Sequence, residues 1–164
     1  MKWRRKIPDR TPPPAGSEPD PALEVEQAAI GFLAQREHSR FELERKLARR
    51  FAQDGLVAVV LDDLQRRGLV SDQRFAESYV AMRMRKGFGP LRIRAELKER
   101  GIEGALVDAC LDTGRETWMG QLREAASHRF GTEAPSGRAE QGKQARFLQY
   151  RGFPESLIRD YLWD

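Results

Sequence analysis

The chain has 164 residues, about the size of one ordinary domain, and 40% of them are hydrophobic, which is enough to build a buried core. Its 29 basic and 25 acidic residues give a densely charged surface with a net charge of +4, which favours an acidic partner such as nucleic acid. The single cysteine, Cys110, excludes an internal disulfide, and the lack of a signal peptide or of a run near the roughly 18 apolar residues of a membrane span predicts a cytoplasmic protein.

Residues 1–21 are predicted to form a flexible tail. They contain the run TPPPAGSEPDP, in which proline removes backbone donors and disfavours helix, and few apolar side chains could anchor them. Basic residues surround Trp3 at the front of this tail, so it could touch an acidic surface.

Three helices are predicted in residues 22–68. Apolar side chains recur at helical spacing up to Gln35, and Ser39 with Glu42 has the spacing of a capping box that starts a second helix. The valine-rich segment after Gly55 could be a strand, but its apolar spacing favours a third helix, which Gly68 closes.

The same order of three helices returns in residues 71–111 and again in residues 115–164. Ser71 or Asp72 can cap the first helix of the second round, and proline suits the first position of the next helix, where its missing N–H would be unpaired anyway. Glycine ends helices because it adopts the left-handed conformation cheaply. The structural residues predicted at these helix ends are Gly87, Gly89, Pro90, Gly101 and Gly152.

An internal repeat supports this division. The segment LKERGIEGALVDACL, which starts at Leu97, aligns without gaps with LQYRGFPESLIRDYL, which starts at Leu148, a step of 51 residues. Residues 43–64 follow the same plan if four extra residues are allowed. The sequence therefore predicts an all-α helical domain over residues 22–164. A phosphate-binding loop at residues 87–101 is disfavoured, because it would need a preceding strand and a Gly-Lys-Ser/Thr ending.

Candidate catalytic residues are few. His38 and His128 lie far apart and outside a metal-ligand spacing, Cys110 has no evident activating partner, and the neighbouring Asp62 and Asp63 point in different directions on a helix. The apolar neighbours of Cys110 suggest a small buried residue. We therefore expect neither an enzyme nor a bound cofactor or metal.

Positive charge is concentrated between residues 83 and 100. On a helix, Arg94 and Lys98 share one face, while Tyr79 continues the apolar stripe of Phe75 and is expected in the core. Such a basic ridge can neutralise phosphates or pair with acidic side chains of a protein. The predicted binding residues are Arg83, Arg85, Lys86, Arg92, Arg94, Lys98 and Arg100.

Three segments resemble the RecX family of recombination regulators: SRFELERKL at residues 39–47, GLVSDQRFAESYVAMRMRKGFGPLRIRAELKERGI at residues 68–102, and RFLQYRGFPESLI at residues 146–158. The resemblance implies an elongated, curved molecule of three tandem three-helix repeats, in agreement with the internal repeat. It also implies a protein without catalytic residues that binds the RecA recombinase in the groove of its filament on single-stranded DNA. Filament growth, ATP hydrolysis, strand exchange and repressor cleavage in the SOS response would then be restrained.

On this interpretation the basic ridge contacts RecA, DNA phosphates or both, and we expect a monomer. Two alternatives come from other classes of protein. Short helices joined by glycine turns can form a stand-alone DNA-binding module of low sequence specificity, and a repeat protein can also serve as an adaptor for another soluble protein.

Overall fold

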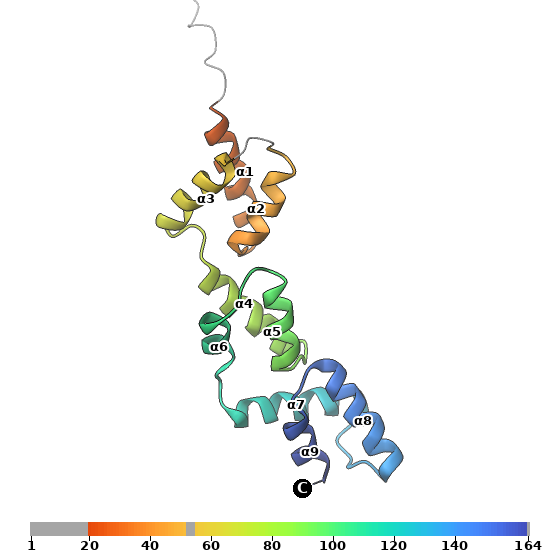
Figure 1. The fold of residues 1–164 in the computed structure, drawn as a ribbon. Helices are drawn as coiled ribbons and strands as arrows, with labels where there is room; N and C mark the ends of the chain where they lie inside the picture. Colours follow the sequence, from red (N-terminus) through yellow and green to blue (C-terminus); the bar gives the residue numbers. More distant parts are fainter. Residues whose placement is uncertain (1–19, 52–54, 164) are drawn as a thin grey trace, which may run out of the picture.

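A computed structural model describes residues 20–51 and 55–163, and within these ranges the chain is entirely helical (Figure 1). The prediction of an all-α fold is therefore confirmed, including a helix rather than a strand after Gly55. Most of the tail predicted at residues 1–21 lies outside the described residues. The helices are α1 (Pro21–Leu33), α2 (Arg40–Ala48), α3 (Leu56–Arg66), α4 (Asp72–Arg85), α5 (Pro90–Lys98), α6 (Ala105–Leu111), α7 (Arg115–Phe130), α8 (Arg138–Arg151) and α9 (Glu155–Trp163).

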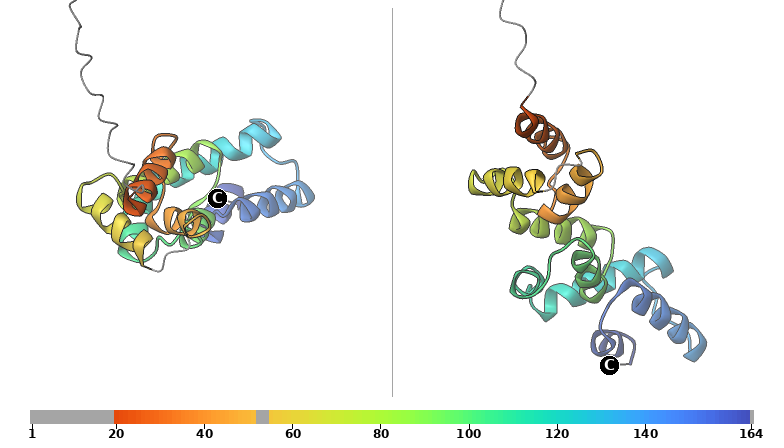
Figure 2. Two further views of the ribbon diagram at one scale, coloured as in Figure 1. Left: turned by 90° about the horizontal axis from the view of Figure 1, so that it is seen from above. Right: turned by 45° about the horizontal axis from the view of Figure 1, so that its top comes forward.

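The helices pack in groups of three. The most extensive helix–helix contacts all lie within α1–α3, within α4–α6 or within α7–α9, and the three groups follow one another along an elongated molecule (Figures 1 and 2). This arrangement confirms the predicted tandem three-helix repeats. The first, second and third units below are these three groups.

Two helix starts show how local sequence sets these bounds. The Ser39 hydroxyl accepts a hydrogen bond from the backbone N–H of Glu42 at 3.1 Å, as the capping-box spacing predicts. The Glu42 carboxylate instead pairs with Arg36, at 2.9 Å. At the start of α4 the cap is Ser71, whereas the Asp72 carboxylate accepts from the backbone N–H of Arg40 in the first unit, at 2.8 Å.

Glycine ends helices as predicted. Gly101 has a φ of +76°, and the backbone N–H of the following Ile102 reaches back to the Leu97 carbonyl at 3.0 Å, which closes the last turn of α5. The equivalent Gly152 ends α8 with a φ of +89° and the same pattern of backbone bonds. These two positions need glycine because other residues rarely adopt a positive φ.

The buried apolar residues form two separate cores. The first unit has its own core, whereas the second and third units share one continuous core, so these two are joined by apolar packing as well as by the chain. Cys110 is only half-buried at the margin of the shared core, in contrast to the buried position expected from its neighbours. The largest fully buried side chains include Leu43, Leu47, Leu61 and Leu64 in the first core and Ile93, Leu97, Leu122, Leu148, Phe153 and Ile158 in the second.

The middle helices of the units, α2, α5 and α8, follow one another head to tail. The end of α8 meets the start of α5, where the backbone N–H of Gly89 donates to the Arg151 carbonyl at 2.8 Å and that of Leu91 to the Gly152 carbonyl at 3.0 Å. One unit earlier, the end of α5 meets the start of α2, and the Ser39 hydroxyl donates to the Arg100 carbonyl at 2.8 Å. Arg100 and Arg151 are equivalent in the repeat, so in both joints the accepting carbonyl belongs to the same repeat position.

We call the series formed by these three helices the middle-helix edge; in Figure 1 it follows one side of the molecule. Each contact sets carbonyls from the end of one helix against the first turn of the next, where backbone N–H groups lack helical partners. The middle-helix edge is thus continuous from α8 through α5 to α2.

Candidate interaction surface

The seven basic residues predicted as a binding ridge divide into two groups. Arg83, Arg92 and Arg100 are partly buried and turn toward Glu96. The other four, Arg85, Lys86, Arg94 and Lys98, are exposed. The structure therefore brings together the first group as internal partners and leaves the second group facing solvent.

Glu96 is the centre of the internal group. Its carboxylate accepts hydrogen bonds from Arg83, from Arg92 Nε at 3.1 Å and from the Tyr79 hydroxyl at 3.0 Å. Arg100 Nη1 donates to the Glu96 backbone carbonyl at 2.6 Å. Burial alone would raise the pKa of Glu96, but the bonds from Arg83, Arg92 and Tyr79 outweigh it and hold the pKa below its ordinary value. The carboxylate is therefore ionised at neutral pH.

Tyr79 is partly buried and packs against the core rather than lying inside it as expected. Its ring stacks on Phe75 with 5.7 Å between centroids, and the Arg100 guanidinium lies 4.7 Å from the Tyr79 centroid. Burial, followed by the hydrogen bond to Glu96, raises the pKa of the Tyr79 hydroxyl.

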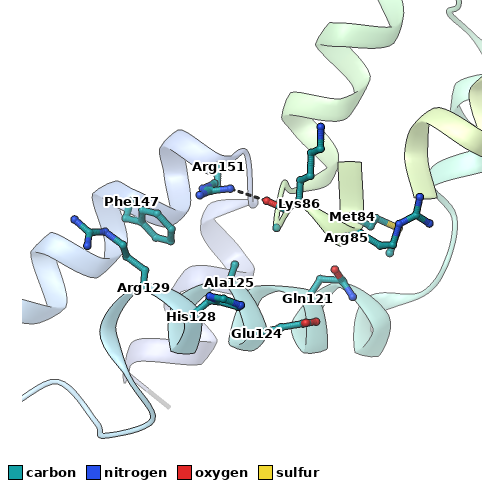
Figure 3. Close-up of a pocket in the computed structure, with 11 residues that line it drawn as sticks. Met84, Arg85, Lys86, Gln121, Glu124, Ala125, His128, Arg129, Phe147 and Arg151 are labelled. Carbon is teal, nitrogen blue, oxygen red and sulfur yellow. Dashed lines mark hydrogen bonds between the residues drawn. The ribbon is translucent and has the colours of Figure 1, made fainter. Parts of the chain in front are cut away.

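Phe88 organises a second set of arginines, at the joint between the second and third units. The guanidinium carbons of Arg83, Arg92 and Arg151 lie 3.7, 4.6 and 4.8 Å from its ring centroid. Arg151 also donates to the Lys86 carbonyl at 2.7 Å, the bond drawn in Figure 3. Cation–π contacts of this kind hold the two units in register. The sequence analysis missed both Phe88 and Arg151. The alignment of Arg151 with Arg100 in the repeat could have indicated Arg151.

The exposed residues Arg94 and Lys98 lie one turn apart on α5 and share a face, as their spacing predicts. Arg94 forms an exposed ion pair with Asp108, at 2.6 Å. Exposed pairs of this kind contribute little to stability, so Arg94 can exchange its partner at small cost.

Exposed basic side chains also lie on α2 and α8, at other positions of the repeat than Arg94 and Lys98, and the sequence analysis did not single them out. Arg45 and Arg49 lie one turn apart at the end of α2, and Lys143 and Arg146 lie on α8. The signal that could have found them is the repeat itself, because each middle helix carries more basic than acidic residues. Each third helix, α3, α6 and α9, has one more acidic than basic residue, so charge is sorted by position in the repeat.

A pocket of about 290 Å³ lies at the joint between the second and third units, between the end of α4 and helices α7 and α8 (Figure 3). Arg85 and Lys86 border it on one side, and His128 with Glu124 lines it from α7. Figure 3 shows the Lys86 side chain pointing away from Ala125 and His128. The pocket walls combine both charges with amide and apolar groups. This mixed lining does not assemble a nucleophile with a base.

His38 is a buried structural residue. Its Nε2 accepts from Lys46 Nζ at 2.8 Å, and its Nδ1–H donates to the Arg36 carbonyl at 3.0 Å. Burial lowers the pKa of His38, so the ring is neutral at pH 7. Over residues 20–51 and 55–163 no group of three or more His, Cys, Asp or Glu residues could hold a metal ion. None of the helices described is long and apolar enough to cross a membrane.

Comparisons with known proteins point to one family. The sequence matches the models of the second and third three-helix domains of RecX, over residues 71–111 and 119–162. It is 41% identical over 139 residues to the regulatory protein RecX of Pseudomonas fluorescens strain SBW25, covering 85% of this chain and 90% of that one. The identity to the regulatory protein RecX of Halorhodospira halophila is 43% over 135 residues, with 82% and 84% covered.

Solved structures share the fold. The crystal structure of RecX from Lactobacillus salivarius superposes with a TM-score of 0.74 at 24% identity, covering 87% of this chain and 94% of that chain. Another crystal structure, of a regulatory protein RecX, gives the same TM-score at 21% identity, with 87% and 71% covered.

Proposed function

Since this chain belongs to the RecX family of regulatory proteins, we propose that it binds the RecA recombinase and its filament on single-stranded DNA, as a non-enzymatic regulator. In this role it inhibits filament growth, ATP hydrolysis and strand exchange, and thereby restrains the SOS response. It acts in the cytoplasm as a monomer, because RecA and its DNA are there and because each unit buries its apolar side within the chain.

The observation that carries the proposal is the middle-helix edge. Three helices follow one another in head-to-tail order along one side of an elongated molecule (Figure 1), and each of them carries more basic than acidic residues. Stacked short-helix repeats build long surfaces of this kind, which suit the groove of a helical filament better than a compact globule would. Successive helices with an excess of cations also complement a partner that carries phosphates or acidic side chains.

The division of the arginines sharpens the proposed site. Arg83, Arg92 and Arg100 are committed to Glu96, so their role in binding is to hold α5 in place. Arg94 and Lys98 are the exposed cations of α5, at the centre of the middle-helix edge. We therefore place the direct contact with the filament at Arg94 and Lys98, together with the exposed Arg85 and Lys86 at the end of α4.

The test is a double charge reversal, Arg94→Glu with Lys98→Glu. We expect binding to RecA filaments on labelled single-stranded DNA, measured by fluorescence anisotropy with a non-hydrolysable ATP analogue, to weaken by about tenfold or more, or roughly 1.4 kcal/mol. Helicity from circular dichroism should be unchanged, because both side chains are exposed.

The matched control is Arg123→Glu with Arg159→Glu. These two arginines are also exposed but belong to α7 and α9 rather than to a middle helix, and the change of net charge is the same. The control should bind the filament nearly as the parent chain does. Equal weakening in both double variants would mean that net charge alone governs binding, and full binding by the α5 variant would remove Arg94 and Lys98 from the site.

A further inference from the structure

Tyr150, near the end of α8, is the most exposed of the large hydrophobic side chains in residues 20–51 and 55–163, with 74% of its surface accessible. It lies at the joint where α8 meets α5, two residues before the glycine that ends α8. A single exposed apolar residue is ordinary, so its surroundings decide whether it has a use.

The backbone and one side of Tyr150 are fixed by Arg92. Arg92 Nη1 donates to the Tyr150 carbonyl at 3.2 Å, and its guanidinium carbon lies 5.0 Å from the centroid of the tyrosine ring. Arg92 is itself held by Glu96 at 3.1 Å and lies over Phe88. A cation therefore occupies a fixed position beside the ring, and most of the ring surface still faces solvent.

Two further cations share the exposed side of α8. Lys143 and Arg146 stand seven and four residues before Tyr150, a spacing that places all three side chains on one face, over about 10 Å of helix. After Glu140, which is engaged by the backbone N–H and the hydroxyl of Ser136, α8 has no acidic residue. The face thus combines an open aromatic ring with cations at both ends.

We propose that this face of α8 is a direct contact for single-stranded DNA, in which one base stacks on the exposed ring of Tyr150 and Lys143 and Arg146 neutralise neighbouring phosphates. Proteins that bind single strands without sequence preference combine aromatic platforms with basic tracks in this way. A duplex would not serve, because its bases are already stacked on one another. The inference rests on the proposed function and deepens it: DNA is assigned to the end of α8, and protein contacts are left to Arg94 and Lys98.

The test measures binding of the full chain to a fluorescein-labelled oligothymidylate without RecA, by anisotropy at low and moderate salt. Tyr150→Leu, which keeps an apolar side chain and good helix propensity, should weaken binding by about tenfold, a typical loss for one stacked base. Tyr150→Phe keeps the ring and should bind as the parent chain does. Trp163→Leu, which removes another exposed aromatic side chain on α9, is the matched control and should change nothing.

Replacing Lys143 and Arg146 by Gln should lower the dependence of log K on log salt by about one for each phosphate that these side chains neutralise in the parent chain. The inference is overturned if Tyr150→Leu binds the oligonucleotide like the parent chain, or if Tyr150→Phe weakens binding as much as Tyr150→Leu. It is also overturned if Tyr150→Leu weakens only binding to RecA filaments, which would make this face a protein contact. If the parent chain does not bind the oligonucleotide but still inhibits RecA, this inference alone is overturned and the proposed function stands.

Discussion

Glu96 is the residue on which the cationic side chains around α5 converge, and its surroundings explain why so many arginines can lie together. The side chains of Arg83 and Glu96 are only 14% and 17% exposed. A charge buried to this degree needs a partner, because the cost of removing it from water is large. Glu96 supplies that partner from the same helix that presents Arg94 and Lys98 on its other side.

We predict that Glu96→Ala lowers the free energy of unfolding by about 3 kcal/mol, because it leaves Arg83 and Arg92 without their common acceptor. Chemical denaturation followed by circular dichroism measures this change. The control is Glu99→Ala, just after the same helix. Because the Glu99 carboxylate is 76% exposed, this substitution should change the free energy of unfolding by less than about 0.5 kcal/mol. If the two variants were equally stable, the network around Glu96 would contribute nothing to folding.

The same carboxylate makes stability depend on pH. Because the pKa of Glu96 is below its ordinary value in the folded chain, its stabilising effect is complete above the unfolded pKa of about 4.3 and is lost as pH falls through the folded pKa. Below about pH 4, the free energy of unfolding of Glu96→Gln should therefore fall less steeply with decreasing pH than that of the parent chain. The measurement is the urea midpoint across this acid range.

Sequence reasoning treated the seven basic residues as one ridge. The pattern of apolar residues locates the buried side of a helix, but a long arginine side chain at its border can turn inward or outward, and the partner decides which. The spacing of Arg92 and Glu96, four residues apart, made their pairing predictable, whereas the approach of Arg83 from α4 required the packed unit. Phe88 was missed for the same reason, because its cationic neighbours come from three helices or their ends.

At the level of elements, the glycines have a second role beyond ending helices. A Cβ atom at Gly89 would lie 2.5 Å from the carbonyl carbon and oxygen of Gly152, although the φ of Gly89, −88°, is open to any residue. At the other joint, a Cβ at Gly101 would lie 2.6 Å from Phe41 Cβ. The units therefore approach one another closely at both joints. At one joint the backbone of Gly89 lies against the backbone of Gly152, and at the other the backbone of Gly101 lies against the Phe41 side chain.

Gly89→Ala should consequently destabilise the chain by about 2 kcal/mol, since the backbone of Gly152 cannot move aside without breaking the joint. Urea unfolding is again the measurement. Gly120→Ala on α7 is the matched control: nothing lies within 4 Å of the added carbon, and alanine should stabilise that helix by up to about 1 kcal/mol. If Gly89→Ala were as stable as the parent chain, this result would contradict the close approach of Gly89 to the Gly152 backbone.

The helix bounds were largely predictable because caps, proline and glycine are local signals. The repeat also predicted that Gly101 and Gly152 occupy equivalent places. Their contacts with the next middle helix were not predictable, because they depend on how one finished unit docks on another. The basic residues of α2 and α8 were overlooked for a related reason: Arg45 and Arg146 occupy the same place in the repeat, but α5 carries Ala95 there, so the α5 ridge does not point to them.

For the whole molecule, the head-to-tail middle helices and the division into two cores define how the three units are joined. The second and third units share a core and are held by the arginines around Phe88, whereas the first unit meets the second mainly through polar bonds such as Arg74 to Glu37 at 2.8 Å. The middle-helix edge crosses both joints. A partner that contacts its full length would therefore bind across both cores at once.

The most direct measurement for the central claim, regulation of the RecA filament, is the rate of ATP hydrolysis by the cognate RecA on single-stranded DNA while the full chain is added below equimolar amounts. We predict strong inhibition at these low ratios, with little inhibition by the Arg94→Glu, Lys98→Glu variant and ordinary inhibition by the Arg123→Glu, Arg159→Glu control. An unchanged hydrolysis rate, together with salt-sensitive binding of the chain to naked DNA, would contradict the claim and favour a stand-alone DNA-binding module.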